Sequence, residues 1–437
     1  MLPPGRLQPR RWESHPWHLL SYLPRPPPCA LSRLCQQPHP PPHSPSPSPS
    51  EAQPLSPTLT LWTSEQGAVL EMVRTLAGEF GMQRGVEVAV VPKDADGLRV
   101  DMIAHELAGE PLPDLIWGNQ EDLAGLLHDG FLQPVGPASA GGVFVRAAVE
   151  GATYAGSLWG QPLTVQDFLL LLFHRPMVAQ PPSTTDALIT LSRTVEEAEE
   201  PGREAAERYG LVAAWDEARW FLVWVNGFGG SITTPDGATP TLTTTQVISS
   251  FNLLRELAVA APPGPQKGRD WFGSGQVALA IDGPWALSGY RSLSPTLDLG
   301  IAPLPQVPST GLMAASAMGG SYLMLGRDVE GELLVRARAL ARFLVLPDVQ
   351  VRLALASGRL PALRSALKAP AITSDPVLGP AVLQAETASG LPPTPALRCV
   401  FQGINAFLPR LLEGETSHEE VAAAMQHEAE RCLGEEP

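Results

Sequence analysis

Short apolar runs alternate with helically spaced apolar positions along the chain from Leu59 onward. The run Leu59–Thr63 has the length of a buried strand. After it, apolar side chains recur at a spacing that places them on one face of a helix, at positions 69, 72, 73, 76, 77 and 80. A strand at 86–91, a helix over Leu98–Ala108, a strand at 113–118 and a helix from about 121 to 128 continue the series. The pattern predicts an α/β fold.

Strands that alternate with helices of this length indicate a parallel sheet with right-handed crossovers. The carboxyl ends of parallel strands lie along one edge of such a sheet, which is where a ligand-binding crevice forms. Two polar turns follow predicted strands and would share that edge. The first contains Ser64 and Glu65, and the second contains Trp117, Asn119 and Gln120. We therefore expect these five residues to face a ligand.

The segment 270–290 carries the most specific local signal. It begins as a turn of helix, continues as a short buried strand at 277–281 and then reads Gly283-Pro284-Trp285. Glycine relaxes the backbone and proline lacks the N–H that a sheet needs, so the pair ends the strand. Trp285 is then held on a rigid turn beyond a strand end, as a ligand-contacting group would be. The other interpretation of Trp285 is a core residue.

Residues 1–57 have a different composition and hold 17 of the 47 prolines. A tract of this kind neither propagates a helix nor buries a core, so we expect a disordered, linker-like segment. The apolar run at 17–23 is too short for the core of a signal peptide and ends at Pro24. A misassigned start or a lost leader would explain this, and so would a protein that is not exported.

Charge and composition exclude several classes of partner. The chain has 437 residues, 44% apolar and 17% charged, and a formal net charge of −15. Such a body repels nucleic acid and anionic membranes, and it disfavours phosphorylated ligands at long range. A neutral ligand is expected. The most apolar run, at 168–173, is strand-sized and far shorter than a membrane-spanning helix.

Only four cysteines occur, and two of them lie near the C-terminus. Cys399 and Cys432 could pair in an oxidising compartment. Two unpaired structural thiols are the alternative.

Signals of catalysis are lacking. The sequence has no G-x-S-x-G, P-loop or H-E-x-x-H motif, and Arg431 stands where a second histidine would follow His427. A glycosidase would need two opposed carboxylates, which the sequence neither signals nor excludes. We expect a protein without catalysis, cofactor or metal site.

The segment 272–285 resembles the F-x-x-G-x-x-A-x-x-x-x-G-P-W segment of the bacterial extracellular solute-binding proteins of family 1, the maltose-binding-protein-like receptors of ABC sugar importers. Further segments resemble that family in the same order, at 113–117, 122–134, 158–162, 168–174, 228–230, 298–305 and 336–362. Together they cover nearly everything from Leu59 to Cys432.

The resemblance implies a two-lobed, type II periplasmic-binding-protein-like fold, in which each lobe is a sheet flanked by helices and a cleft lies between the lobes. The chain would cross between lobes near 164–167, 314–319 and 368–373. The first lobe would hold 58–165 and 319–368, and the second 166–318 and 369–437.

The resemblance also implies a set of site residues. Trp117 stands where the first lobe presents a tryptophan to the ligand, and Trp220, Trp285 and Phe401 stand at aromatic positions of the second lobe. Core packing is the alternative for each ring. Gln120 and Gln166 replace acids of the maltose-binding protein. The remaining candidates are Ser64, Glu65, Asn119, Gly320 and Tyr322.

A sugar suits such a set, because aromatic rings match the apolar face of a pyranose and polar side chains match its hydroxyls. We expect a monomeric, non-catalytic receptor in the periplasm or at the cell surface, which binds a carbohydrate and delivers it to the permease subunits of an ABC transporter. One alternative is a receptor of the same fold for a polyamine or other small organic cation, bound through cation–π contacts. The other is a carbohydrate-active enzyme.

Overall fold

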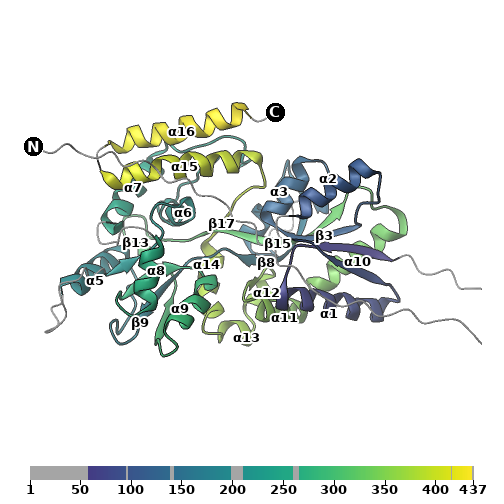
Figure 1. Cartoon of the computed structure of the whole chain (residues 1–437), viewed down its shortest axis with the longest axis horizontal. Coiled ribbons are helices and arrows are strands. Elements are labelled where there is room, and N and C mark those ends of the chain that lie inside the picture. The colour runs from purple at the N-terminus through teal and green to yellow at the C-terminus, as the bar shows by residue number, and fades with distance from the viewer. Residues whose placement is uncertain are drawn as a thin grey trace, which may run out of the picture. The chain divides into compact units, whose positions relative to one another are not determined.

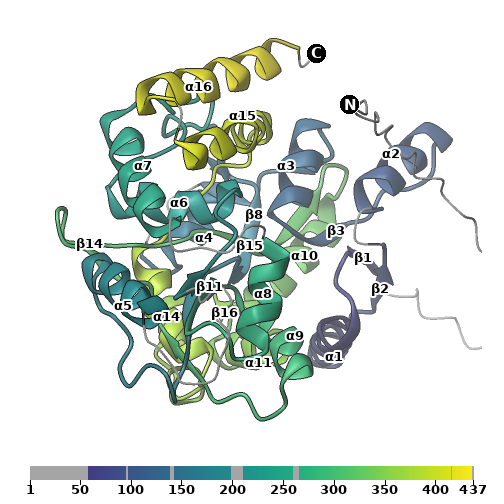
Figure 2. The same ribbon diagram turned by 60° about the vertical axis from the view of Figure 1, so that its left-hand side comes forward.

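The structure is a computed structural model, and it describes residues 58–94, 97–137, 142–197, 210–258, 265–414 and 416–435. The proline-rich segment 1–57 lies outside these residues, so its predicted disorder is untested. Figures 1 and 2 show two α/β parts, each made of a sheet and its helices. One lies around β1, β3 and β15 and the other around β9 and β11.

The first sheet has the strand order β16-β8-β15-β3-β1-β2, and β4 and β17 also pair with β15. Its strands are β1 (Leu59–Thr63), β2 (Val88–Pro92), β3 (Leu115–Asn119), β4 (Leu132–Gln133), β8 (Gly160–Gln166), β15 (Ala317–Gly326), β16 (Leu360–Pro361) and β17 (Ser389–Gly390). β1 runs parallel to β2 and β3, as the sequence predicts. β15 runs antiparallel to β3 and β8.

Helices cover both faces of this sheet. They are α1 (Gly67–Arg84), α2 (Leu98–Ala108), α3 (Gln120–His128), α10 (Gly331–Leu344) and α11 (Pro347–Ser357). Leu61 and Trp117 belong to the core that contains residues of α1, α10 and α11, whereas Trp62 and Ile116 belong to the core under α2 and α3. Alternation along each strand explains this division, because successive side chains point to opposite faces.

The second sheet has the order β10-β11-β9-β12. Its strands are β9 (Leu170–His174), β10 (Leu211–Val212), β11 (Leu279–Asp282) and β12 (Leu299–Ala302). Around it lie α5 (Thr185–Glu197), α6 (Ala218–Gly227), α7 (Thr245–Ala258), α8 (Pro265–Gly273), the 3₁₀ turn η1 (Pro284–Ala286) and α9 (Leu287–Leu293). The strand predicted at 277–281 is β11, two residues later at its start.

Smaller elements complete the fold. They are β5 (Gly136–Pro137), α4 (Arg146–Glu150), β6 (Thr153–Tyr154), β7 (Ser157–Leu158), β13 (Gln306–Val307), β14 (Leu312–Met313), α12 (Arg364–Leu367), α13 (Pro370–Thr373), α14 (Leu378–Thr387), α15 (Pro395–Glu413) and α16 (His418–Glu435). α15 and α16 pack along each other (Figure 1) and are joined by the disulfide Cys399–Cys432. The two interpretations of these cysteines were a disulfide and two free thiols, and the structure has the disulfide.

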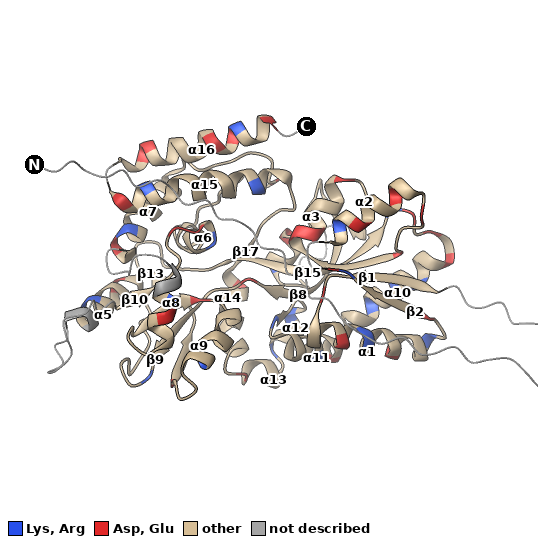
Figure 3. Ribbon diagram, viewed as in Figure 1, with Lys and Arg blue, Asp and Glu red and all other residues tan. Residues whose placement is uncertain are grey.

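Acidic and basic side chains are interspersed along the outer helices, as on α16 (Figure 3), where Arg431 contacts both Glu428 and Glu435. None of the described helices combines the length and the apolar character that crossing a membrane requires.

Candidate functional site

A cleft of about 870 Å³ opens between elements of the two sheets. One wall is the N-terminal part of α3, with Asn119 and Gln120. The floor contains Gln166, Asp167 and Gly319, where β8 pairs with β15. The other wall comes from α6 and from the segment that leads into α15, and its lining residues include Arg219, Leu222, Leu391, Pro393, Arg398 and Phe401. The volume lies within the range of about 300–1,000 Å³ that is usual for ligand sites.

The polar turn at the start of α3 is held by a capping box. The Asn119 side chain accepts hydrogen bonds from the backbone N–H groups of Glu121 and Asp122, at 2.8 and 2.9 Å, and Asp122 accepts one from Asn119 N–H. Gln120 points into the cleft, where its Nε2 donates to the Leu391 carbonyl. The rigid cap therefore places Gln120 at the cleft wall.

Ser64 and Glu65, which the sequence predicts at the same edge, contact residues around the first sheet and do not face the cleft. Ser64 Oγ donates to Asp122 Oδ2 at 2.9 Å, and Glu65 is buried in an ion pair with Arg359. Burial raises the pKa of the Asp122 carboxyl, although hydrogen bonds from Asn119 and Ser64 oppose the rise. Neither Ser64 nor Glu65 is part of the cleft lining.

One polar atom at the floor of the cleft and one behind it have no hydrogen-bond partner among the described residues. Gln166 Oε1 and the Tyr322 hydroxyl are buried and make no hydrogen bond within the described part of the chain. Burial raises the pKa of Tyr322, and the nearby Asp167 carboxylate adds to the rise, so the phenol stays a neutral donor. Buried polar atoms of this kind call for an explanation, such as a water or a ligand group.

Two glycines make this floor possible. A Cβ on Gly319 would lie 2.7 Å from Asp167 Oδ2 and 3.1 Å from Gln120 Oε1, and a Cβ on Gly320 would lie 2.9 Å from the Tyr322 hydroxyl. Any side chain there would displace these polar groups. Gly320 and Tyr322 therefore lie directly behind the cleft floor, next to Gly319, without being part of its lining.

The aromatic candidates divide into two groups. Trp117 and Trp220 are only 1% and 5% exposed, and each belongs to a hydrophobic core, Trp117 at the first sheet and Trp220 at the second. Phe401 is half-buried in the cleft wall, whereas Trp285 is 46% exposed and is not part of the cleft lining. The expected cleft position of Trp117 and Trp220 therefore does not hold in this structure. Trp117 lies on the strand face that α1 and α10 cover, and Trp220 lies beneath the end of β11.

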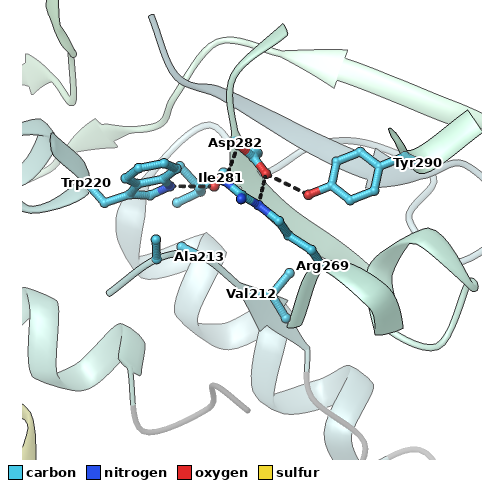
Figure 4. A pocket seen from close by; sticks show the side chains of 8 residues that line it. Val212, Ala213, Trp220, Arg269, Ile281, Asp282 and Tyr290 are labelled. Carbon is cyan, nitrogen blue, oxygen red and sulfur yellow. Dashed lines mark hydrogen bonds and ion pairs between the residues drawn. The ribbon is translucent and has the colours of Figure 1, made fainter. Parts of the chain in front are cut away.

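The end of β11 is braced by Asp282, a buried carboxylate that the sequence analysis did not single out (Figure 4). It accepts hydrogen bonds from Arg269 Nε at 3.0 Å, from the Tyr290 hydroxyl at 2.7 Å and from Gly283 N–H at 2.8 Å. Burial raises the pKa of Tyr290, with the Asp282 charge as the next cause. This network fixes the turn that carries Trp285. An acid at the end of the otherwise apolar strand was the available signal.

Asp167 and Arg219 are two charged residues of the cleft that sequence reasoning missed. They lie 52 positions apart, and no local motif links them. Among the described residues, no three His, Cys, Asp or Glu side chains cluster so that they could hold a metal ion.

The two α/β parts, each built on one sheet, flank a cleft of ligand size. This arrangement defines a two-lobed binding protein. The chain belongs to a family of bacterial extracellular solute-binding proteins, whose model matches residues 75–380. It is similar to the maltotriose-binding protein of Pyrococcus abyssi, with 24% identity over 396 residues, 88% of this chain and 83% of the relative.

Solved structures give the same fold. A cyclo/maltodextrin-binding protein in complex with maltotetraose superposes with a TM-score of 0.76 at 22% identity, over 88% of this chain and 99% of that one. The maltose-binding periplasmic protein of Listeria monocytogenes, in complex with maltose, gives 0.74 at 19% identity, over 87% and 98%. The fold is thus the two-lobed periplasmic-binding-protein-like fold predicted from the sequence.

Proposed function

We propose that this protein captures a sugar or oligosaccharide between its lobes and delivers it to an ABC importer, without catalysis. The cleft lining supports this most directly, because it combines apolar surface at Leu222, Leu391 and Phe401 with hydrogen-bonding side chains at Gln120 and Gln166. An oligosaccharide presents the same mixture of apolar ring faces and hydroxyls. The similar proteins above are named or solved with maltooligosaccharides.

The candidate ligand contacts are Asn119, Gln120, Gln166 and Phe401 in the cleft, with Trp285 as a further platform. Gly320 and Tyr322 support the floor from behind. In this proposal the first lobe comprises 58–165 with 319–368 and the second comprises 166–318 with 369–437. Family membership supports export, and we place the protein in the periplasm or at the cell surface, as a monomer whose partners are permease subunits.

The charge of the cleft disfavours an organic cation. Arg99, Arg219 and Arg398 contribute to its lining, whereas its carboxylates are Glu121 and Asp167. A polyamine or quaternary amine would find the Asp167 carboxylate of the lining already paired with Arg219. A neutral sugar experiences no such penalty.

Isothermal titration with maltose, maltotriose, maltotetraose, cellobiose and spermidine tests the proposal, with chromatography of each mixture afterwards. Binding of a sugar without a new product supports a receptor. Binding of spermidine alone would favour the cation alternative, and release of shorter sugars would indicate an enzyme.

A further inference from the structure

The outward side of α2 has the apolar spacing of a buried helix face. The buried residues of this helix are Leu98 and Met102, which belong to the core beneath it. The side that faces solvent carries apolar residues with the spacing i, i+3, i+4, i+7 and i+8, at Val100, Ile103, Ala104, Leu107 and Ala108. On a helix this spacing makes one continuous stripe. We call these five residues the α2 stripe.

The α2 stripe is exposed along its whole length. Its three large side chains are 63%, 38% and 83% exposed in chain order, and its two alanines are exposed as well. Other exposed apolar side chains, such as Met82, Val335 and Leu383, lie on three different helices. Single exposed apolar residues are normal on a soluble protein, whereas a contiguous set marks an interaction surface.

The charged side chains of α2 already have partners within the protein. Arg99 donates two hydrogen bonds to the Asp129 carboxylate, at 2.6 and 2.8 Å. The two acids of the helix form ion pairs with basic residues of neighbouring segments, Asp101 with Lys93 and Glu106 with Arg327. Because these charges are neutralised internally, the stripe suits an apolar partner and does not require an opposite charge.

The α2 stripe begins beside the cleft. Arg99, which precedes Val100, is part of the cleft lining, and so is Gly125 of α3. A Cβ on Gly125 would lie 3.1 Å from Arg99 Cδ, so the glycine lets the two helices approach closely. Figures 1 and 2 show α2 and α3 next to each other. A partner seated on the stripe is therefore adjacent to the cleft.

Size and charge distinguish between the possible occupants of the stripe. A stable interface takes about 20–30 residues on each side, so five residues on one short helix do not hold two copies of this chain together. Helices that bind anionic membranes carry many basic residues beside their apolar face. Here the chain has a net charge of −15, and Arg99 is paired with Asp129. The stripe fits a protein partner that binds transiently.

We propose that the α2 stripe is a docking site for a permease subunit of the importer, which presents apolar side chains to Val100, Ile103 and Leu107. The assignment rests on the proposed function, in which the sugar leaves the cleft for the transporter. Such a transfer needs a contact that forms beside the cleft and then dissociates, and a small apolar surface supplies one. Sugar binding itself does not involve the stripe, since none of its residues lines the cleft.

The test compares two full-length triple variants. The first combines Val100→Gln, Ile103→Gln and Leu107→Gln, because glutamine is polar and favours a helix. The matched control combines Met82→Gln, Val335→Gln and Leu383→Gln, which removes three exposed apolar side chains outside the stripe and the cleft lining. Both proteins should melt and bind sugar as the wild type does, with maltose, maltotriose, maltotetraose and cellobiose as probes.

Uptake should distinguish the two variants. In cells that produce the protein, each variant replaces the wild type, and the sugar that binds best is supplied in radiolabelled form below its Kd. Uptake should fall about 10- to 100-fold for the stripe variant, as expected when clustered interface residues are lost, and should stay unchanged for the control. Normal uptake by the stripe variant would overturn the docking site.

Photo-crosslinking in the same cells identifies the occupant. A p-benzoylphenylalanine in place of Ile103 should form an adduct that mass spectrometry assigns to a permease subunit, and the same group in place of Met82 should not. An adduct with a second copy of this chain, or with any protein other than a permease subunit, would overturn the proposal. In these cases the proposed function stands if the wild type binds sugar. A wild type that binds none of the sugars would overturn the proposed function and the permease assignment with it.

Discussion

The ring of Trp285 stands edge-on to the ring of Trp220, with centroids 6.4 Å apart and planes at 84°. Trp220 is buried, and its Nε1 donates to the Ile281 carbonyl at 2.7 Å. Trp285 keeps 46% of its surface exposed. The inner ring thus supports the outer one in a favourable edge-to-face contact, and the outer ring remains free to meet a ligand.

Trp285→Ala should weaken sugar binding with little effect on stability. A stacking ring is worth roughly 1–3 kcal/mol in comparable contacts, so affinity should fall about 5- to 150-fold. Titration and thermal melts measure the two effects. The control is Trp224→Ala, a fully buried core ring, which should cost about 3–5 kcal/mol of stability. A Trp285→Ala protein that melts far lower but binds normally would show that the ring is structural.

Asp282→Asn should lower the free energy of unfolding by about 1–3 kcal/mol, because Arg269 and Tyr290 lose a charged, buried acceptor. Urea denaturation measures the loss. Asp298→Asn serves as the control, since its pair with Arg175 is mostly exposed, at 61% and 53%, and contributes little. Equal stability of the two variants would contradict the bracing role of Asp282.

Reduction of the Cys399–Cys432 disulfide should lower stability by about 3–4 kcal/mol, because the bond closes a loop with a sequence separation of 33. Sugar affinity should also fall, since α15 carries Phe401 in the cleft wall. Melts and titrations with and without dithiothreitol test both effects. The Cys399→Ser, Cys432→Ser double variant should behave like the reduced protein and ignore the reductant. A response of that variant to the reductant would place the effect elsewhere.

Stability should fall in acid partly through His174. Burial lowers the pKa of this residue, against weaker opposing effects of the Phe272 carbonyl and Asp298. The unfolded chain therefore takes up a proton below about pH 6.5 while the folded state resists it, so stability drops as the pH falls through that range. His174→Gln should flatten the profile of unfolding free energy between pH 7 and 5. Parallel profiles for His174→Gln and wild type would exclude the effect.

The strands and helices between Leu59 and His128 could be predicted because each has its own apolar period. Strand β1 has the predicted limits, and the buried positions of α1 include Val73, Leu76, Ala77 and Phe80 from the predicted face. These features depend on neighbours within a few residues. The antiparallel β15 in the middle of the first sheet follows from no such period, because its pairing partners lie far away in sequence.

The candidate site also has residues that local sequence predicts and residues whose position depends on packing. Asn119, Gln120, Gln166 and Phe401 line the cleft, as expected from strand ends and from the family resemblance. Trp117 also lies near a strand end, yet its ring is covered. Alternation decides only that neighbouring side chains take opposite faces, and which face a helix later covers depends on packing.

The sequence by itself determined the α/β class, the family, the turn that exposes Trp285 and the uncharged glutamines of the cleft, because each resides in a short, contiguous pattern. Only the tertiary structure decided that Asp167 meets Arg219, that Asp282 collects Arg269 and Tyr290, and that Cys399 reaches Cys432. Such pairings join residues through the packing of whole elements. Their geometry is set by the side chains that fill the space between those elements, which no local pattern specifies.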